Sequence, residues 1–170
     1  MPNKYLRLDA GRIKELEAVD SSAGAADAGK ITALDSTGRF DLTMMPVGIG
    51  PDTKEVAASE NLAAGDLVNI FDNGGSIAVR KADASSEGKE AIGFVLDAVT
   101  SGANALIYLD GTVTGLSGLT PGARYYLDSA TAGGITATAL TTAGEISQYV
   151  GRAVAATELA FESSQAITIA

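Results

Sequence analysis

Apolar and polar positions follow two different patterns along the chain, and the change falls near residue 55. From residue 56 onward, short apolar and β-branched runs are separated by Gly-containing turns, which is typical of an all-β domain. Turns of the hairpin kind are marked by the pairs Asn73-Gly74, Asp110-Gly111 and Gly133-Gly134. We expect about eight strands, near residues 66–72, 76–81, 90–99, 104–114, 123–128, 134–139, 147–155 and 165–169.

A degenerate repeat runs through this predicted domain. Residues 62–70 parallel residues 119–127 at an offset of 57, and residues 91–95 parallel residues 149–153 at an offset of 58. Each half contains a Gly-turned strand, a hairpin partner, a strand centred on Ile/Val-Gly and a final strand. The final strands are expected at residues 105–109 and 166–169. Two four-stranded halves predict a small β-barrel or β-sandwich with a pseudo-two-fold repeat, whose closure would protect its strand edges.

Residues 1–55 show no sustained hydrophobic period. One short helix is predicted over residues 12–19, where Ile13, Leu16 and Val19 are spaced to form an apolar stripe. The small residues that follow, 21–29, are typical of a linker. A second ordered stretch, residues 30–45, is expected to end at Pro46 and the Gly-Pro cluster after it.

The apolar side chains of residues 1–55 are too scattered to form a core of their own. We therefore predict an extended N-terminal arm that buries them against its own C-terminal domain or against a partner. Residues 8–13 and 34–41 each place a cation and an apolar residue after an Asp/Gly turn, which suggests two similar anchor points; two ordinary β-turns are the simpler interpretation. The candidate arm contacts are Tyr5, Leu6, Arg7, Arg12, Ile13, Leu16, Lys30, Ile31, Leu34, Arg39, Phe40, Met44 and Met45.

Composition restricts the chemistry that the chain can perform. Its 170 residues include no Cys and no His, which excludes disulfides, thiolate or imidazole metal sites, and nucleophiles of the Ser/His or Cys/His type. Carboxylates that could serve a hydrolase occur mostly at strand ends or turns, where Asp is ordinary: Asp66, Asp72, Asp83, Asp97, Asp110, Asp128 and Glu145. The Asp72-Asn73-Gly74-Gly75 stretch fits a hairpin turn better than a calcium loop. We therefore expect no catalytic residues, no metal and no cofactor.

The charge distribution divides the chain at the same place. The formal net charge is −9, and residues 1–55 hold seven of the 12 basic residues against nine of the 21 acidic ones. The acidic surplus thus belongs to residues 56–170, and we expect neither nucleic acid nor membrane as a partner. No apolar run approaches the length of a membrane span, and the N-terminus lacks the apolar core of a signal peptide, which favours synthesis in a cytoplasm.

Two adjacent aromatic residues, Tyr125 and Tyr126, lie in a predicted strand, where one ring must face inward and the other outward. The simple interpretation is one core ring and one exposed ring. In the functional interpretation, the pair anchors a contact between subunits.

Two segments resemble virion proteins of tailed bacteriophages. Residues 27–46, DAGKITALDSTGRFDLTMMP, resemble a segment that precedes a small β domain in such proteins. Residues 115–128, GLSGLTPGARYYLD, with AGGIT at 132–136, are similar to a segment that recurs in phage tail-fibre and head-decoration proteins. The resemblance implies a structural protein without catalytic residues.

Within this class, the layout favours a capsid decoration, or cement, protein. Residues 1–55 would lie across neighbouring subunits of the major capsid protein, and residues 56–170 would stand above the outer surface of the virion shell as a homotrimer at a three-fold axis. The alternative is a tail-fibre or virion-surface adhesin. An adhesin predicts saturable glycan binding by residues 56–170, which cement function alone does not predict.

Overall fold

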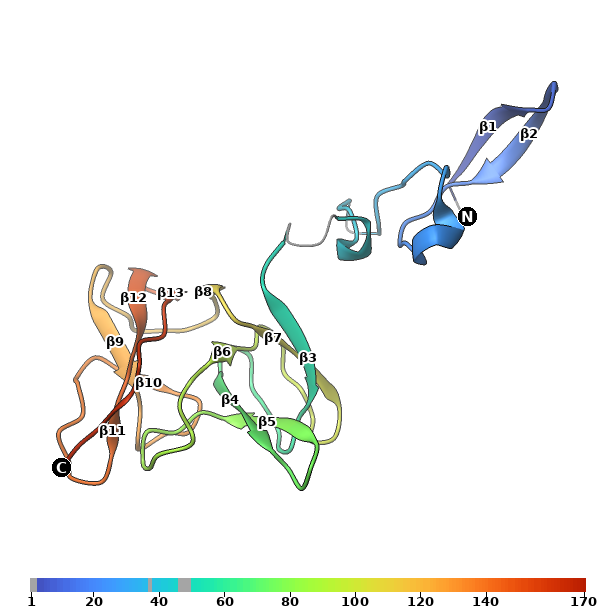
Figure 1. The fold of residues 1–170 in the computed structure, drawn as a ribbon. Helices are drawn as coiled ribbons and strands as arrows, with labels where there is room; N and C mark the ends of the chain where they lie inside the picture. Colours follow the sequence, from blue (N-terminus) through green and yellow to red (C-terminus); the bar gives the residue numbers. More distant parts are fainter. Residues whose placement is uncertain (1–2, 37, 46–49) are drawn as a thin grey trace. The chain divides into compact units, whose positions relative to one another are not determined.

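The computed structural model describes residues 3–36, 38–45 and 50–170. Thr37 and residues 46–49 lie outside the described residues, and with them the predicted stop at Pro46. The chain divides into two compact units, Met1–Gly50 (unit 1) and Pro51–Ala170 (unit 2) (Figure 1). The predicted boundary between residues 55 and 56 falls inside a strand of unit 2, β3 (Thr53–Ala57).

Unit 1 begins with an antiparallel hairpin of β1 (Lys4–Asp9) and β2 (Arg12–Glu17). The prediction of a helix over residues 12–19 is therefore wrong. Apolar residues three apart lie on one side of a helix but on opposite sides of a strand, so Ile13 and Leu16 face different ways in β2. Pairing with β1 over six residue pairs supplies the backbone hydrogen bonds that a helix would have made internally.

The rest of unit 1 has little regular structure. It contains two 3₁₀ turns, η1 (Gly24–Asp27) and η2 (Leu42–Met44). A single parallel bridge joins Val19 to Thr32, with hydrogen bonds from the Val19 N–H to Ile31 O (3.0 Å) and from the Ala33 N–H to Val19 O (2.7 Å). The segment after the hairpin is thus held to residues 31–33 by main-chain bonds.

Unit 2 contains two five-stranded antiparallel sheets, which confirms the all-β prediction. The first sheet has the strand order β3-β7-β6-β4-β5. Its strands are β3, β4 (Leu67–Asp72), β5 (Ile77–Lys81), β6 (Gly93–Phe94) and β7 (Asn104–Tyr108). Ala58, just after β3, forms a single bridge with Val79 of β5, the opposite edge strand.

The second sheet has the strand order β10-β9-β12-β13-β8. Its strands are β8 (Gly111–Val113), β9 (Arg124–Leu127), β10 (Ile135–Thr136), β12 (Tyr149–Ala155) and β13 (Glu158–Phe161). A small separate ladder pairs β11 (Ile146–Ser147) with β14 (Ile167–Thr168). Neither sheet closes into a barrel within residues 50–170, because each strand order ends in two edge strands that form no ladder with each other.

Several strand predictions differ from the structure. The single strand expected over residues 104–114 is two strands, β7 and β8, which belong to different sheets. β3 and β13 were not expected, and β13 pairs with β12 and β8 in the second sheet. The final strand expected at residues 166–169 is β14, which pairs with β11 in the separate ladder.

The buried side chains form two clusters, both made of unit 2 residues. One lies within the first sheet and its loops: Val56, Ala58, Leu62, Val68, Val79, Val95, Ala105 and Ile107. The other joins Leu67 and Phe94 of the first sheet to the inner face of the second, including Tyr125, Leu127, Val150 and Leu159. Phe94 stacks on Tyr108 and meets Phe161 edge-on, with ring centroids 5.5 Å apart in both pairs. This second cluster therefore holds the two sheets together.

Candidate functional site

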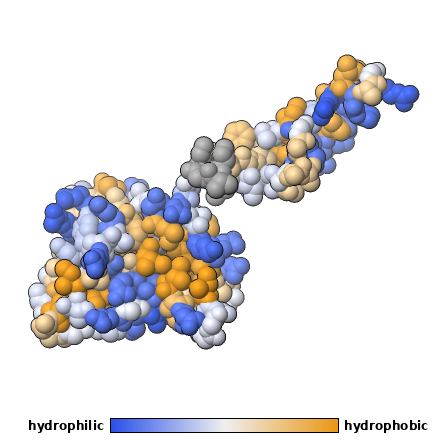
Figure 2. Space-filling view, viewed as in Figure 1, coloured by the Kyte–Doolittle hydropathy of each residue, from blue (hydrophilic) through white to orange (hydrophobic). Residues whose placement is uncertain are grey.

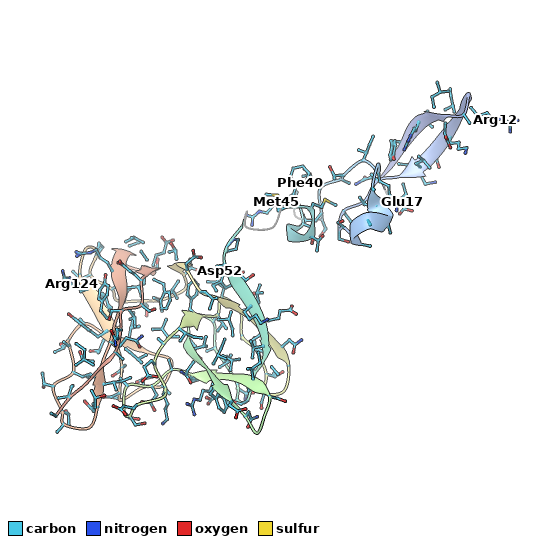
Figure 3. All side chains as sticks on the ribbon, viewed as in Figure 1. Arg12, Glu17, Phe40, Met45, Asp52 and Arg124 are labelled. Atoms are coloured by element: carbon cyan, nitrogen blue, oxygen red, sulfur yellow. The ribbon has the colours of Figure 1, made fainter. Side chains whose placement is uncertain are left out.

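Unit 1 exposes the apolar side chains that were predicted to seek a partner. None of the unit 1 residues whose exposure the structure describes is buried. Among the predicted arm contacts, the large apolar side chains left exposed are Leu6, Ile13, Ile31, Leu34, Phe40 and Met45; Tyr5, Leu16 and Met44 are half-buried. Hydrophobic and hydrophilic residues are interspersed on the face of unit 1 seen in Figure 2, and the exposed Phe40 and Met45 are labelled in Figure 3. Most of its apolar surface therefore remains in contact with water.

The β1–β2 register sorts the hairpin side chains into two faces. Leu6, Leu8 and Ile13 share one face near the turn and are 70%, 70% and 73% exposed. We call these three residues the apolar hairpin face. Leu8 and Ile13 are directly opposite each other, so the three side chains form one patch rather than scattered positions.

Three of the hairpin cations, Arg7, Arg12 and Lys14, lie on the opposite face, which we call the basic face. Arg7 lies opposite Lys14, and Arg12 lies opposite Asp9. Lys14 also forms an ion pair with Asp9 at 2.6 Å. Near the open end, Tyr5 lies opposite Leu16, and the Tyr5 hydroxyl is buried with no hydrogen-bond partner among the described residues. Near the turn, the hairpin thus has apolar groups on one face and mostly basic groups on the other. Toward the open end, Lys4, Glu15 and Glu17 lie on the apolar hairpin face, and Tyr5 and Leu16 lie on the basic face.

Two acidic side chains organise the loops of unit 1. Hydrogen bonds from Lys30 Nζ (2.6 Å) and from the main-chain N–H of Ala23 (2.6 Å) hold the pKa of Asp27 below its ordinary value of 3.8. Hydrogen bonds from the hydroxyl and the N–H of Thr43 lower the pKa of Asp41 in the same way. Of the predicted arm cations, Lys30 is thus paired within unit 1, and Arg7 donates to Gly29 O at 3.2 Å. Arg39 is exposed, with its N–H bonded to Asp35 Oδ1 (3.0 Å).

The predicted tyrosine pair is divided between core and surface. Tyr125 is buried in the cluster that joins the sheets, and its hydroxyl accepts a hydrogen bond from the Thr120 N–H at 2.9 Å. Tyr126 points to the other side of β9, where it meets Tyr149 edge-on with ring centroids 6.1 Å apart. Tyr126 is therefore the member of the pair that reaches the surface.

Tyr126 lines a pocket that the sequence interpretation missed. The pocket has a volume of about 420 Å³ and is lined by Arg124, Tyr126, Tyr149, Arg152 and Glu162. Figure 3 labels Arg124 on β9. Arg124 is directly opposite Arg152, and Tyr126 is directly opposite Tyr149, on the paired strands β9 and β12. The signal was present in the two sequences RYY and YVGR, but only the strand pairing places them side by side.

Several of the carboxylates considered for catalysis have local structural contacts. Asp66 forms an ion pair with Lys81 (3.2 Å), and Asp83 forms one with Lys89 (3.5 Å). Asp72 Oδ1 accepts the Gly75 N–H at 2.7 Å within the turn between β4 and β5. In the described part of the chain, no three Asp or Glu side chains come together to hold a metal ion, and no helix is long and apolar enough to cross a membrane.

Comparisons with known proteins give no family assignment. No protein-family model matches the chain, and no curated protein matches it.

Proposed function

We propose that the protein is a capsid decoration, or cement, protein of a tailed bacteriophage. Unit 1 binds the outer surface of the major capsid protein shell, and unit 2 stands above that surface, grouped in trimers. The segments of residues 27–46 and 115–136 that resemble phage virion proteins support this proposal. The observation that carries it is the absence of any buried residue among the unit 1 residues whose exposure the structure describes.

The energetics of unit 1 favour a partner. Transfer of a Leu or Ile side chain from water to an apolar surface contributes about 1.5–3 kcal/mol. The apolar hairpin face alone holds three such side chains, all more than two-thirds exposed. A two-stranded hairpin is marginally stable in water by itself, so a capsid surface that covers this face would stabilise both the complex and the hairpin.

The basic face gives the same hairpin a second kind of contact. Arg7, Arg12 and Lys14 lie together on that face. An acidic groove between capsid subunits would attract these cations while the other face packs on apolar groups. Such a contact would therefore have a salt-dependent association rate and a salt-independent apolar component.

Unit 2 does not need unit 1 for its core, because every buried hydrophobic side chain in the described part of the chain belongs to unit 2. We also propose that unit 2 is a tandem of two related halves. The strand order β3-β7-β6-β4-β5 has the same pattern as β8-β13-β12-β9-β10. In this comparison β3, β4, β5, β6 and β7 of the first half correspond to β8, β9, β10, β12 and β13 of the second.

Main-chain hydrogen bonds at the repeat offsets support the tandem. The Gly65 N–H donates to Val95 O, and the Gly122 N–H donates to Ala153 O, both at 2.8 Å. The pair Leu62 N–H to Val99 O (2.8 Å) likewise corresponds to Leu119 N–H to Ala156 O (3.1 Å). The halves thus share loop contacts as well as strand order.

A head-binding assay tests the cement function. Expanded heads of the parental phage, stripped of this protein, are mixed with the full chain or with the variant Leu6→Ser/Leu8→Ser/Ile13→Ser, and bound protein is measured by co-sedimentation. Loss of three apolar contacts is expected to weaken binding by at least about 100-fold. The matched control is Ile77→Ser/Ile167→Ser, which removes apolar side chains of 57% and 68% exposure from unit 2.

Residues 51–170 alone provide the complementary arm of the assay, since unit 2 has its own core. This fragment is expected to fold but not to bind stripped heads. Undiminished head binding by the fragment, or equal losses in the triple variant and its control, would contradict attachment through unit 1.

A virion-surface adhesin is the second candidate, and the pocket on β9 and β12 favours it. In that case unit 2 binds a glycan, whether or not unit 1 attaches to the shell.

A further inference from the structure

The outward face of β9 and β12 gathers four large side chains by means of a β-bulge. Tyr149 and Arg152 are three residues apart, so in a regular strand they would point to opposite sides of the sheet. The register shift between Tyr149 and Gly151 inserts one extra residue in β12. As a result Tyr149 pairs with Tyr126 and Arg152 pairs with Arg124 on the same face.

The two arginines are placed against electrostatic preference. Like charges directly opposite each other on neighbouring strands destabilise a sheet. Neither guanidinium lies within ion-pair distance of a carboxylate among the described residues. Arg152 is instead held by a hydrogen bond from Nη1 to Gly122 O at 2.5 Å, which fixes its position and leaves other N–H groups for a ligand.

The first half of unit 2 has a different pair at the corresponding register. There, Leu67 of β4 lies opposite Phe94 of β6, and both are buried in the cluster that joins the two sheets. Arg124 and Arg152 take the places of Leu67 and Phe94 under the proposed repeat. They are exposed and pack into neither cluster, so this face of the second sheet is free of a packing role.

The five side chains around the pocket select a ligand by its chemistry. Two guanidinium groups side by side match a carboxylate, with which Arg forms paired hydrogen bonds. Tyr126 and Tyr149 offer half-exposed rings against which a ligand ring can pack. Glu162 accepts hydrogen bonds from hydroxyl groups and disfavours a doubly charged phosphate through repulsion. The volume of about 420 Å³ lies in the usual range for small-ligand sites.

We propose that this pocket binds an acidic saccharide, in which a sugar ring with hydroxyl groups carries a carboxylate. The carboxylate is bound by Arg124 and Arg152, the ring packs against Tyr126 and Tyr149, and a hydroxyl donates to Glu162. This inference deepens the adhesin candidate and is independent of head binding, which belongs to unit 1.

The test titrates the full chain, by NMR shift changes or calorimetry, with N-acetylneuraminate and glucuronate as probes. Neutral glucose, inorganic phosphate and a Glu-rich peptide are the comparison ligands. Saturable binding of an acidic sugar is expected, with Arg124→Gln and Arg152→Gln each weakening it by about 10-fold or more. Tyr126→Leu is expected to weaken binding of the acidic sugar more than it weakens binding of phosphate.

Lys54→Gln is the matched control, because it removes one exposed positive charge on β3, outside the pocket. If Lys54→Gln and Arg124→Gln weaken sugar binding equally, general electrostatic attraction explains the binding, and the proposed site is wrong. Preference for phosphate or for the Glu-rich peptide would overturn the saccharide assignment, as would the absence of saturation by either sugar. Melting curves of each variant confirm that its fold is intact. Head binding measured on the same variants separates a failure of this site from a failure of the cement function.

Discussion

The side-chain amide of Gln148 pairs with the main chain of Ala91 through two hydrogen bonds. Gln148 Nε2 donates to Ala91 O, the Ala91 N–H donates to Gln148 Oε1, and both bonds are 2.8 Å long. Gln148 precedes β12 of the second sheet, and Ala91 precedes β6 of the first. Both residues are buried, so a polar contact reinforces the apolar cluster that joins the two halves of unit 2.

Replacement of this amide is expected to destabilise unit 2. Gln148→Leu leaves the buried N–H and C=O of Ala91 without partners, which costs about 2–4 kcal/mol. Gln148→Glu keeps one acceptor for the Ala91 N–H, but when ionised it turns a second oxygen toward Ala91 O. Its free energy of unfolding at neutral pH should therefore fall at least as much as that of Gln148→Leu. Urea unfolding at pH 7 measures both. Wild-type stability in Gln148→Leu would contradict a structural role for the pair.

Two glycines are expected to tolerate no side chain, because each lies against the backbone of a neighbouring strand. A Cβ at Gly93 would lie 2.5 Å from Tyr108 O, and a Cβ at Gly151 would lie 2.2 Å from Ala160 O. Gly93→Ala and Gly151→Ala should each destabilise unit 2 by more than about 3 kcal/mol. Gly74→Ala, in a turn with φ of +68° and open space around it, should cost only about 1–2 kcal/mol. Thermal unfolding of the three variants compares them, and similar losses in all three would refute the close-approach explanation.

The turn of the unit 1 hairpin contains a removable strain. Ala10 has φ of +48° beside Gly11 at +78°, a conformation that suits Asn or Gly better than Ala. Ala10→Gly is therefore expected to stabilise the hairpin by about 1 kcal/mol, and Ala10→Val to destabilise it. Amide hydrogen exchange of β1 and β2 reports the change. Slower exchange in the valine variant than in the wild type would show that this turn does not limit hairpin stability.

Asp83 is expected to contribute to acid unfolding. Partial burial raises the pKa of this carboxyl, but hydrogen bonds from the Ser85 N–H and hydroxyl, and the attraction of Lys89, outweigh burial and bring the pKa below 3.8. Its contribution to stability is therefore complete above the unfolded-state pKa and is lost as the pH falls through the lower folded-state pKa. Unfolding free energies from pH 2.5 to 7 should fall more steeply for the wild type below pH 4 than for Asp83→Asn. Parallel curves would exclude this contribution.

Local sequence predicted the all-β class and most strand positions of unit 2. Strands such as β4 and β9 follow Gly-containing turns, and β9 also alternates exposed and buried side chains; both signals act within a few residues. The same local rule placed one of Tyr125 and Tyr126 in the core and the other on the surface. The exposure of apolar side chains in residues 1–50 was predictable as well, because that segment has too few of them in any regular spacing to cover one another.

Pairing between distant residues decided the rest. Over residues 12–19, the spacing of Ile13, Leu16 and Val19 fits a helix. Residues 12–17 form a strand instead because residues 4–9 pair with them over six residue pairs. The short strand β13 is positioned by its pairing with β12 and β8, which flank it in the sheet. The pocket likewise depends on a bulge in β12 and on its register with β9, which sets Arg124 beside Arg152. Sequence alone determined which residues favour strands, turns or exposure, because those preferences are local. Tertiary structure decided which strands meet and which side chains share a face, because register is set by contacts between segments far apart in the chain.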